Sequence, residues 1–291
     1  MKKIIFLLWL QGWDNAPWLQ REVLSSWKIN NPEWNIELID QKNLKNYVSD
    51  IDYIYDKSKN ISPQAKSDII RLSLLKNFGG VWADSTLLCM QPLKNWVFEA
   101  IKPSGIWMYH GHGAGLNSGL GPASWFIISE KYGYVITKWK KACDSFWQNN
   151  YEAKEYFWMD ILFKNLLKDD PIFKEQWINT PFLYCEKEGS SHTLASYNYK
   201  MEENTRFIKD IFKIKPPYVL KLSNQIEKKL PNISSKRFKS SNAYYAIQMS
   251  KRGYFYKHIF EPKEFIANPV KEKPYFLKLL KKIIKRVLQI K

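Results

Sequence analysis

Asp68 and Arg71 lie three positions apart in a segment whose apolar spacing predicts a helix over residues 63–78. On a helical wheel both charges fall within the apolar face, because their angular neighbours are leucines and a phenylalanine. The opposite, wet face is predicted to carry Lys66, Ser73, Lys76 and Asn77. A buried charge is costly unless it is paired, and a spacing of three lets the two side chains meet.

Two interpretations of this pair stay open. It can be an internal salt bridge that only fixes the helix. It can also be a polar pair on the floor of a cleft, where the aspartate accepts hydrogen bonds from hydroxyl groups and the arginine contacts phosphate or sugar oxygens.

A third charged residue, Asp84, follows a Gly79-Gly80 pair that ends the helix and lets the chain reverse. Residues 81–88 predict a strand that returns beside the helix. Asp84 comes directly after the apolar residues 81–83 of this segment and ends that apolar stretch. Ligands of α/β sheets bind beyond the carboxyl ends of parallel strands, and a divalent ion that bridges a diphosphate takes such oxygen ligands. A strand-end cap or turn residue is the alternative role for Asp84.

The elements that must position these residues follow a strand–helix–strand pattern. Residues 3–10 predict a central strand, a helix runs from Pro17 to about Trp27, and residues 34–39 alternate as a second strand. Residues 103–123 hold six of the twelve glycines and predict a long loop. A short strand at 125–128 and helices near 132–147 and 152–168 follow. The sequence therefore predicts an α/β fold with a mostly parallel, mixed sheet flanked by helices.

The net charge of +17 is confined to the end of the chain. Positions 1–205 hold 23 basic and 23 acidic residues, whereas positions 206–291 hold 22 basic and 5 acidic ones. We therefore divide the chain into a catalytic domain (1–205), a basic completion of that domain (206–273) and a tail (274–291). Three separated cysteines exclude a disulfide framework or a paired-cysteine zinc site and favour a reducing compartment.

The tail predicts an amphipathic helix that lies on a membrane. From residue 276 onward, apolar residues fill one half of a helical wheel and five cations fill the other. No run reaches the roughly 18 apolar residues of a membrane span, and the apolar start of the chain is interpreted as a strand and not a signal peptide. We expect a cytoplasmic protein bound peripherally to the anionic inner face of the cell membrane. A helix docked on the domain with a solvated basic face is the alternative.

The string SDIIRLSLLKNFGGVWADST, residues 67–86, resembles the family of capsular polysaccharide synthesis proteins. This family belongs with the DXD-containing sugar transferases that include fungal mannosyltransferases, and it is distantly similar to the sugar-transferring domains of large clostridial toxins. The opening residues 8–40 and, more weakly, EYFWMDILF at 155–163 add to the likeness, which covers about residues 4–165. The shared pattern is S-D-x-x-R-x-x-x-L and then G-G-hydrophobic-aromatic-x-D-x-D, matched by Ser67, Asp68, Arg71, Leu75, Gly79, Gly80, Val81, Trp82 and Asp84.

This resemblance implies a GT-A-like fold, a nucleotide-diphosphate sugar as donor and a divalent cation, Mn²⁺ or Mg²⁺. It also implies a hexose transfer that retains the anomeric configuration. By the same resemblance Asp68 and Arg71 hold the donor sugar or ribose, and Asp84 contacts ribose and metal. Trp9 and Gln11, after the first strand, lie beside the base.

One position departs from the family pattern. Thr86 stands where the second aspartate of the DXD motif is expected. A hydroxyl is a poorer metal ligand than a carboxylate, so the metal is held weakly, completed by another side chain such as His192, or absent.

Five further residues are weaker candidates. His110 and His112 in a glycine-rich stretch could ligate a metal, Asn117 could reach the donor or acceptor, and His192 could meet metal or phosphate. Asp160 could be an acceptor-side base, although such a residue is more often hydrogen-bonded within the packing.

Three functions compete at this point. The first is a glycosyltransferase of capsule or other surface polysaccharide synthesis, acting on a glycan or lipid-linked oligosaccharide. The second is a family member with impaired catalysis and a scaffold role, because of Thr86. The third is a nucleic-acid-binding protein, but no nucleic-acid-binding motif is present and the charge is confined to one end, so we expect no nucleic-acid partner.

Overall fold

A computed structural model of the chain describes residues 1–110, 121–181, 183, 201 and 217–252. A five-stranded sheet in the order β2-β1-β3-β6-β5 forms the centre. β1 pairs in parallel with β2 and β3, whereas β6 runs antiparallel to β3 and β5. The predicted α/β class with a mostly parallel, mixed sheet is confirmed. The strands span Ile4–Leu8 (β1), Asn35–Ile39 (β2), Gly80–Ala83 (β3), Ile106–His110 (β5) and Pro122–Ser129 (β6).

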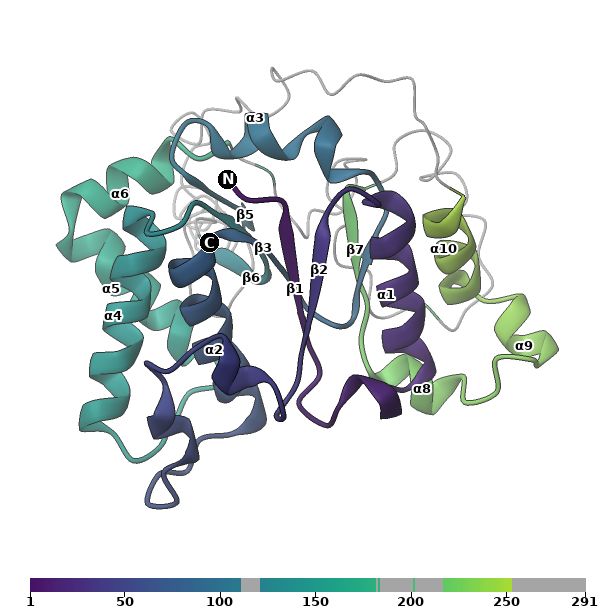
Figure 1. Ribbon diagram of the computed structural model, residues 1–291, viewed down its shortest axis with the longest axis horizontal. Coiled ribbons are helices and arrows are strands. Elements are labelled where there is room, and N and C mark those ends of the chain that lie inside the picture. The colour runs from purple at the N-terminus through teal and green to yellow at the C-terminus, as the bar shows by residue number, and fades with distance from the viewer. Residues whose placement is uncertain (111–120, 182, 184–200, 202–216, 253–291) are drawn as a thin grey trace, which may run out of the picture.

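Helices cover both faces of this sheet, which is the middle of three layers (Figure 1). Alternate side chains of β1 point to opposite faces, so Ile5 and Leu7 enter one apolar core and Phe6 and Leu8 enter the other. The first core includes residues of α1 (Trp18–Asn30), α3 (Val97–Ile101), α8 (Gln225–Lys229), α9 (Lys236–Lys239) and α10 (Asn242–Lys251). The second includes residues of α2 (Pro63–Phe78), α4 (Tyr134–Asn149), α5 (Trp158–Asp169) and α6 (Pro171–Ile178).

Residues 217–252 pack on the N-terminal half of the chain. β7 (Val219–Lys221) pairs antiparallel with β4 (Leu87–Cys89) in a small second sheet. The side-chain amide of Asn30 on α1 donates to the Cys89 oxygen at 3.1 Å and to the Ser250 oxygen on α10 at 2.7 Å. In Figure 1, β7 and α10 accordingly lie on either side of α1. The described part of the basic segment is thus joined to the apolar core that the first strand helps to form.

Helix α2 has the bounds that the sequence predicts, and its ends explain why. The Ser62 hydroxyl accepts a hydrogen bond from the Ala65 N–H, Pro63 occupies the first turn, and Gly79 ends the helix with its N–H bonded to the Leu75 oxygen at 2.8 Å. The predicted wet face was wrong at Ser73. This residue is buried and donates to an Asp50 carboxylate oxygen, because the loop before α2 covers that side.

Two predictions about strands were wrong. The segment 81–88 is two strands, β3 and β4, separated by a turn in which the Leu87 N–H donates to the Asp84 oxygen at 2.9 Å. The segment 103–123 is not a single loop, because β5 occupies residues 106–110 and β6 begins at 122. The loop was predicted from the many glycines of the segment. The five residues of β5 are nevertheless apolar enough to enter the sheet, where all of them are buried.

The predicted tail helix, residues 274–291, lies outside the described residues. Among the helices that the structure describes, none is long and apolar enough to cross a membrane. The membrane prediction therefore rests on the tail sequence.

Gly80 and Gly12 allow a matched test of how closely β3 approaches β1. Both have a positive φ, +97° and +95°, which strains any other residue. A Cβ on Gly80 would meet the side chain of Ile4 and lie 2.6 Å from its oxygen, whereas a Cβ on Gly12 would meet nothing within 4 Å. We expect Gly12→Ala to lower the free energy of unfolding by about 1 kcal/mol and Gly80→Ala by about 3 kcal/mol or more. Urea unfolding of both variants measures the difference, and equal losses would contradict the close approach.

Candidate functional site

Arg71 lies at the centre of a polar cluster where α2 meets β3 and β6. Its Nη1 atom lies 3.0 Å from Asp68 Oδ1 and donates to Ser124 Oγ at 2.8 Å. Its Nη2 atom lies 3.3 Å from Asp84 Oδ1 and 3.3 Å from Ser67 Oγ. The Arg71 side chain is only 7% exposed. The guanidinium is therefore a buried charge paired with two carboxylates. Its pairing with Asp68 was predicted from the position of both residues on the apolar face of the helix.

Asp84 is fixed in orientation by the strand that precedes it. Side chains two apart on a strand share a face, so Asp84 follows Trp82 toward α2. The Trp82 Nε1 atom donates to Asp84 Oδ1 at 3.0 Å, and the Trp82 ring centroid lies 5.2 Å from Arg71 Cζ. The Asp84 N–H donates to the Trp125 oxygen at 3.0 Å. The carboxylate therefore stands at the end of β3 with little freedom to turn.

Lys221 is a member of this site that the sequence interpretation missed. Its Nζ atom lies 2.5 Å from Asp84 Oδ2 and 2.7 Å from Thr86 Oγ1. The antiparallel register of β7 and β4 sets Lys221 opposite Leu87 and so brings the ammonium to this turn. The lysine is 137 residues from Asp84 in a segment rich in lysines. The one available signal was the run Val219-Leu-Lys-Leu222, a single cation inside an apolar strand-like stretch.

The two aspartates of the site differ in their electrostatic surroundings. Burial raises the pKa of Asp68 to about 6; the charge of Arg71 opposes this rise and the charge of Asp84 adds to it. Burial acts to raise the pKa of Asp84 as well, but the nearby Lys221 and Arg71 cations outweigh it and hold that pKa below its usual value. Asp84 is thus an anion at neutral pH, clamped between two cations.

Trp9 and Gln11 lie at the same edge of the sheet as Asp84. Phe6 pairs in parallel with Trp82, so the residues that follow β1 emerge beside those that follow β3. Trp9 is half-buried, and Gln11 is exposed in the loop that leads to α1. The fold therefore brings both residues to the edge that holds the cluster. Their contact with a nucleotide base stays a prediction.

Asp160 lies in the first turn of α5 and is buried. The side chain of Trp158, in the same turn, hydrogen-bonds to Asp68, so α5 begins next to the polar cluster. A role for Asp160 as acceptor-side base stays a prediction.

The interpretation of His110 as a loop residue that could ligate a metal needs correction. His110 ends β5, is 1% exposed, and stacks on Trp177 with 4.3 Å between ring centroids. Burial lowers its pKa to about 3, which keeps the imidazole neutral within the core. His112, Asn117 and His192 lie outside the described residues.

The described residues do not fit a divalent cation at the end of β3. Both oxygens of Asp84 already accept hydrogen bonds from cations or from Trp82, and the Thr86 hydroxyl accepts from Lys221. Within the described part of the chain, no group of three or more His, Cys, Asp or Glu side chains could hold a metal ion. A hard cation needs several oxygen ligands and is repelled by an ammonium among them.

The chain belongs to the family described as capsular polysaccharide synthesis protein, whose pattern matches residues 1–244. The match includes Lys221 as well as the motif around Asp84.

Curated relatives match shorter stretches. Glycosyltransferase afumC of Aspergillus fumigatus is 26% identical over 156 residues, 49% of this chain and 38% of its own length. O-glycosyltransferase braB of Annulohypoxylon truncatum is 28% identical over 94 residues, 28% of this chain and 22% of its own length. The chain thus spans less than two fifths of either relative. A solved structure titled PaToxG Glycosyltransferase is similar with a TM-score of 0.40 and 13% identity, over 86% of each chain.

The raised pKa of Asp68 predicts a pH-dependent stability. Because the folded-state pKa of about 6 lies above the value of 3.8 expected when unfolded, the folded chain binds the proton more tightly between these values. The free energy of unfolding should therefore fall by about 2 kcal/mol as the pH rises from 4 to 6.5, relative to Asp68→Asn, which cannot titrate. Urea unfolding across this range measures it. Asp169 is an exposed carboxylate at the C-terminal end of α5, so the unfolding free energy of Asp169→Asn should change with pH as that of the wild type does. The same pH dependence in Asp68→Asn and in the wild type would contradict the raised pKa of Asp68.

Proposed function

We propose that this chain is a glycosyltransferase that moves a hexose from a nucleotide-diphosphate sugar to a glycan acceptor in the synthesis of capsule or another surface polysaccharide. The observation that carries the proposal is the pair of cations, Arg71 and Lys221, held on either side of Asp84 at the carboxyl end of β3. Family membership and the names of the curated relatives support the same reaction class.

A cationic pair at this place suits a diphosphate. In open α/β sheets ligands bind beyond the carboxyl ends of the strands. The parallel strands β1 and β3 both have their carboxyl ends at this edge of the sheet. Guanidinium and ammonium groups form charge-assisted hydrogen bonds with phosphate oxygens. Asp84 keeps the two cations oriented, and the buried Trp82 beneath the guanidinium excludes water from one side. We assign the diphosphate of the donor to this corner.

The remaining parts of the donor are assigned by position. Asp68 carries a carboxylate next to Arg71, and it can accept hydrogen bonds from sugar or ribose hydroxyls with its second oxygen. Trp9 offers a flat surface for a base at the neighbouring strand end, and Gln11 can hydrogen-bond to its edge. These assignments match the GT-A-like arrangement that the family resemblance implies. We further propose retention of the anomeric configuration, as the family resemblance implies.

A donor panel tests the reaction. We expect wild-type protein to release a nucleoside diphosphate from one of a set of nucleotide sugars, and Asp84→Asn to reduce that rate at least about 100-fold, because the two cations lose their shared anchor. Liquid chromatography of the released nucleotide measures the rate, and NMR of the anomeric proton in the product determines the configuration. Asp169→Asn serves as the matched carboxylate control and should leave the rate unchanged. Release from no donor, in protein shown to be folded, would favour the scaffold role instead.

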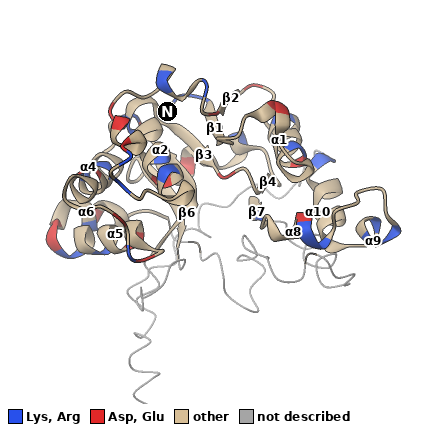
Figure 2. Ribbon diagram, turned by 90° about the horizontal axis from the view of Figure 1, so that it is seen from below, with Lys and Arg blue, Asp and Glu red and all other residues tan. Residues whose placement is uncertain are grey.

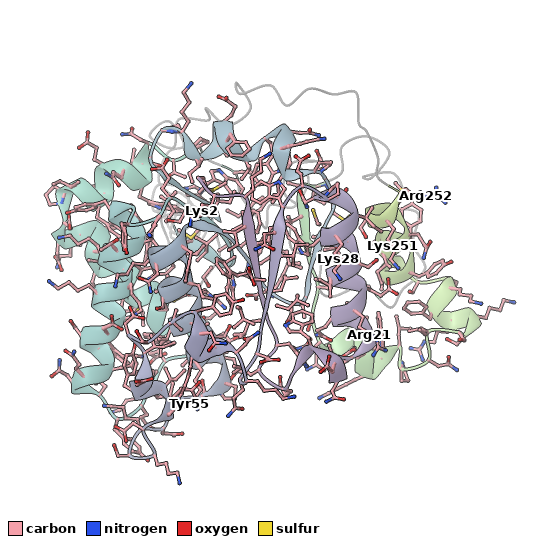
Figure 3. The ribbon with its side chains drawn as sticks, viewed as in Figure 1. Lys2, Arg21, Lys28, Tyr55, Lys251 and Arg252 are labelled. Atoms are coloured by element: carbon pink, nitrogen blue, oxygen red, sulfur yellow. The ribbon has the colours of Figure 1, made fainter. Side chains whose placement is uncertain are left out.

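We also propose that the tail, residues 274–291, holds the protein on an anionic membrane at the cytoplasmic face, where lipid-linked acceptors are reached. Arg252, which follows the last residue of α10, lies in the same half of the molecule as the exposed cations of α1, Arg21 and Lys28 (Figure 3). Figure 2 shows further basic residues on α8 and α9. The described part of the chain therefore presents positive charge of its own, which an anionic membrane would attract together with the tail.

Liposome flotation tests the membrane proposal. Deleting residues 274–291 should release the protein from vesicles that contain anionic lipid, and replacing five of the six tail cations by Gln should release it from these vesicles to a similar extent. The five replaced cations are Lys278, Lys281, Lys282, Lys285 and Arg286. Binding that the deletion leaves unchanged would contradict the proposal.

A further inference from the structure

We propose that the ammonium group of Lys221 occupies the position of the divalent cation at the donor diphosphate, so that this chain binds and uses its donor without a metal ion. The inference rests on the proposed function, because it assigns a role at the same site. It starts from a residue that lies outside the family motif. Lys221 donates hydrogen bonds both to Asp84 and to Thr86, which stands where the second aspartate of the DXD motif is expected.

The hydrogen bonds of Lys221 leave it one donor for a ligand. An ammonium has three N–H donors. Two of them point to Asp84 Oδ2, at 2.5 Å, and to Thr86 Oγ1, at 2.7 Å. The side chain is 16% exposed, so the group is sheltered but not closed off. The third N–H is thus available to a phosphate oxygen, while the other two fix the direction in which the group presents its charge.

Thr86 and Lys221 complement each other in charge. A carboxylate at position 86 would add a negative charge that calls for a dication between it and Asp84. The neutral hydroxyl removes that charge, and a single positive charge from Lys221 then balances Asp84. Arg71 adds a further positive charge on the other side of Asp84. Together with Asp68, the two cations and two carboxylates leave no net negative charge for a divalent ion at neutral pH, and the ammonium of Lys221 would repel an ion placed beside it.

The chemical role follows from the charges in the reaction. The bond between the sugar C1 and the β-phosphate oxygen breaks, and its electron pair stays on that oxygen. The acceptor hydroxyl oxygen forms the new bond to C1, and one proton is released to solvent overall. Negative charge therefore grows on the leaving diphosphate, and a fixed cation there stabilises the transition state more than the ground state. Lys221 supplies this cation from its place on β7.

Nucleotide binding provides a test that does not depend on turnover. Calorimetric titration with UDP, GDP, ADP, CDP and dTDP in the presence of EDTA should find a nucleotide that binds, with an affinity that Mn²⁺ changes less than about twofold. Lys221→Met should weaken this binding about 10- to 100-fold, whereas Lys221→Arg should weaken it less than about tenfold. Lys228→Met, on the exposed surface of α8, is the matched lysine control and should bind as the wild type does.

A swap of the two residues tests the inference from the other direction. The double variant Lys221→Met, Thr86→Asp restores the two-aspartate motif and removes the competing ammonium. It should bind the nucleotide in Mn²⁺ but not in EDTA, whereas the wild type should bind it in both. Circular dichroism melting of each variant separates loss of affinity from loss of fold. If Lys221→Met changes the melting temperature but not the affinity, the lysine is only a structural ion pair and the inference fails.

The outcomes also separate this inference from the proposed function. Turnover by the wild type that EDTA abolishes and Mn²⁺ restores would overturn the role of Lys221 and leave the glycosyltransferase assignment intact. Metal-independent, Lys221-dependent binding without turnover of any donor would support the role of Lys221 and contradict the assignment of activity. Equal turnover in EDTA and in Mn²⁺, lost in Lys221→Met and kept in Lys228→Met, would support both.

Discussion

The charge of Arg71 is the constraint on which the site depends. A guanidinium with 7% of its side chain exposed must be compensated by partners inside the protein. Three segments supply them: α2 itself with Asp68, β3 with Trp82 beneath the guanidinium and with Asp84 at its end, and β6 with Ser124. Each partner fixes the arginine, and the arginine in turn joins α2, β3 and β6 to one another.

The same requirement extends to the C-terminal segment through Asp84. One oxygen of Asp84 serves Arg71 and Trp82, and the other serves Lys221. Without Lys221 the second oxygen of a sheltered carboxylate would lack its cation. The basic segment 217–252 is therefore part of the site as well as the carrier of a surface charge, and its strand β7 is held there by β4 and by the packing of α10 on α1. Compensation of one buried charge thus connects residues that are 150 positions apart.

Sequence patterns predicted the structure correctly where the interactions that decide it join residues close together in the chain. The bounds of α2 were predictable because Ser62, Pro63 and Gly79 act on backbone groups within one turn. The burial of Arg71 was predictable because a helical wheel is a property of the helix alone. Predictions failed where neighbours from elsewhere decided the outcome. Ser73 is covered by the loop that carries Asp50, and His110 enters the sheet as the last residue of a strand that the surrounding glycines concealed.

The sequence by itself determined the α/β class, the helix that carries Asp68 and Arg71, and the place of Asp84 at the end of a strand. These follow from spacing and end signals that act over a few residues. Only the tertiary structure decided which cation meets Asp84 and Thr86. Lys221 is one of many lysines in its segment, and nothing in its neighbours sets it apart except an apolar run of four residues. Strand pairing across 135 residues of chain brings it to Thr86, and such pairing depends on the packing of the whole core and not on any local pattern.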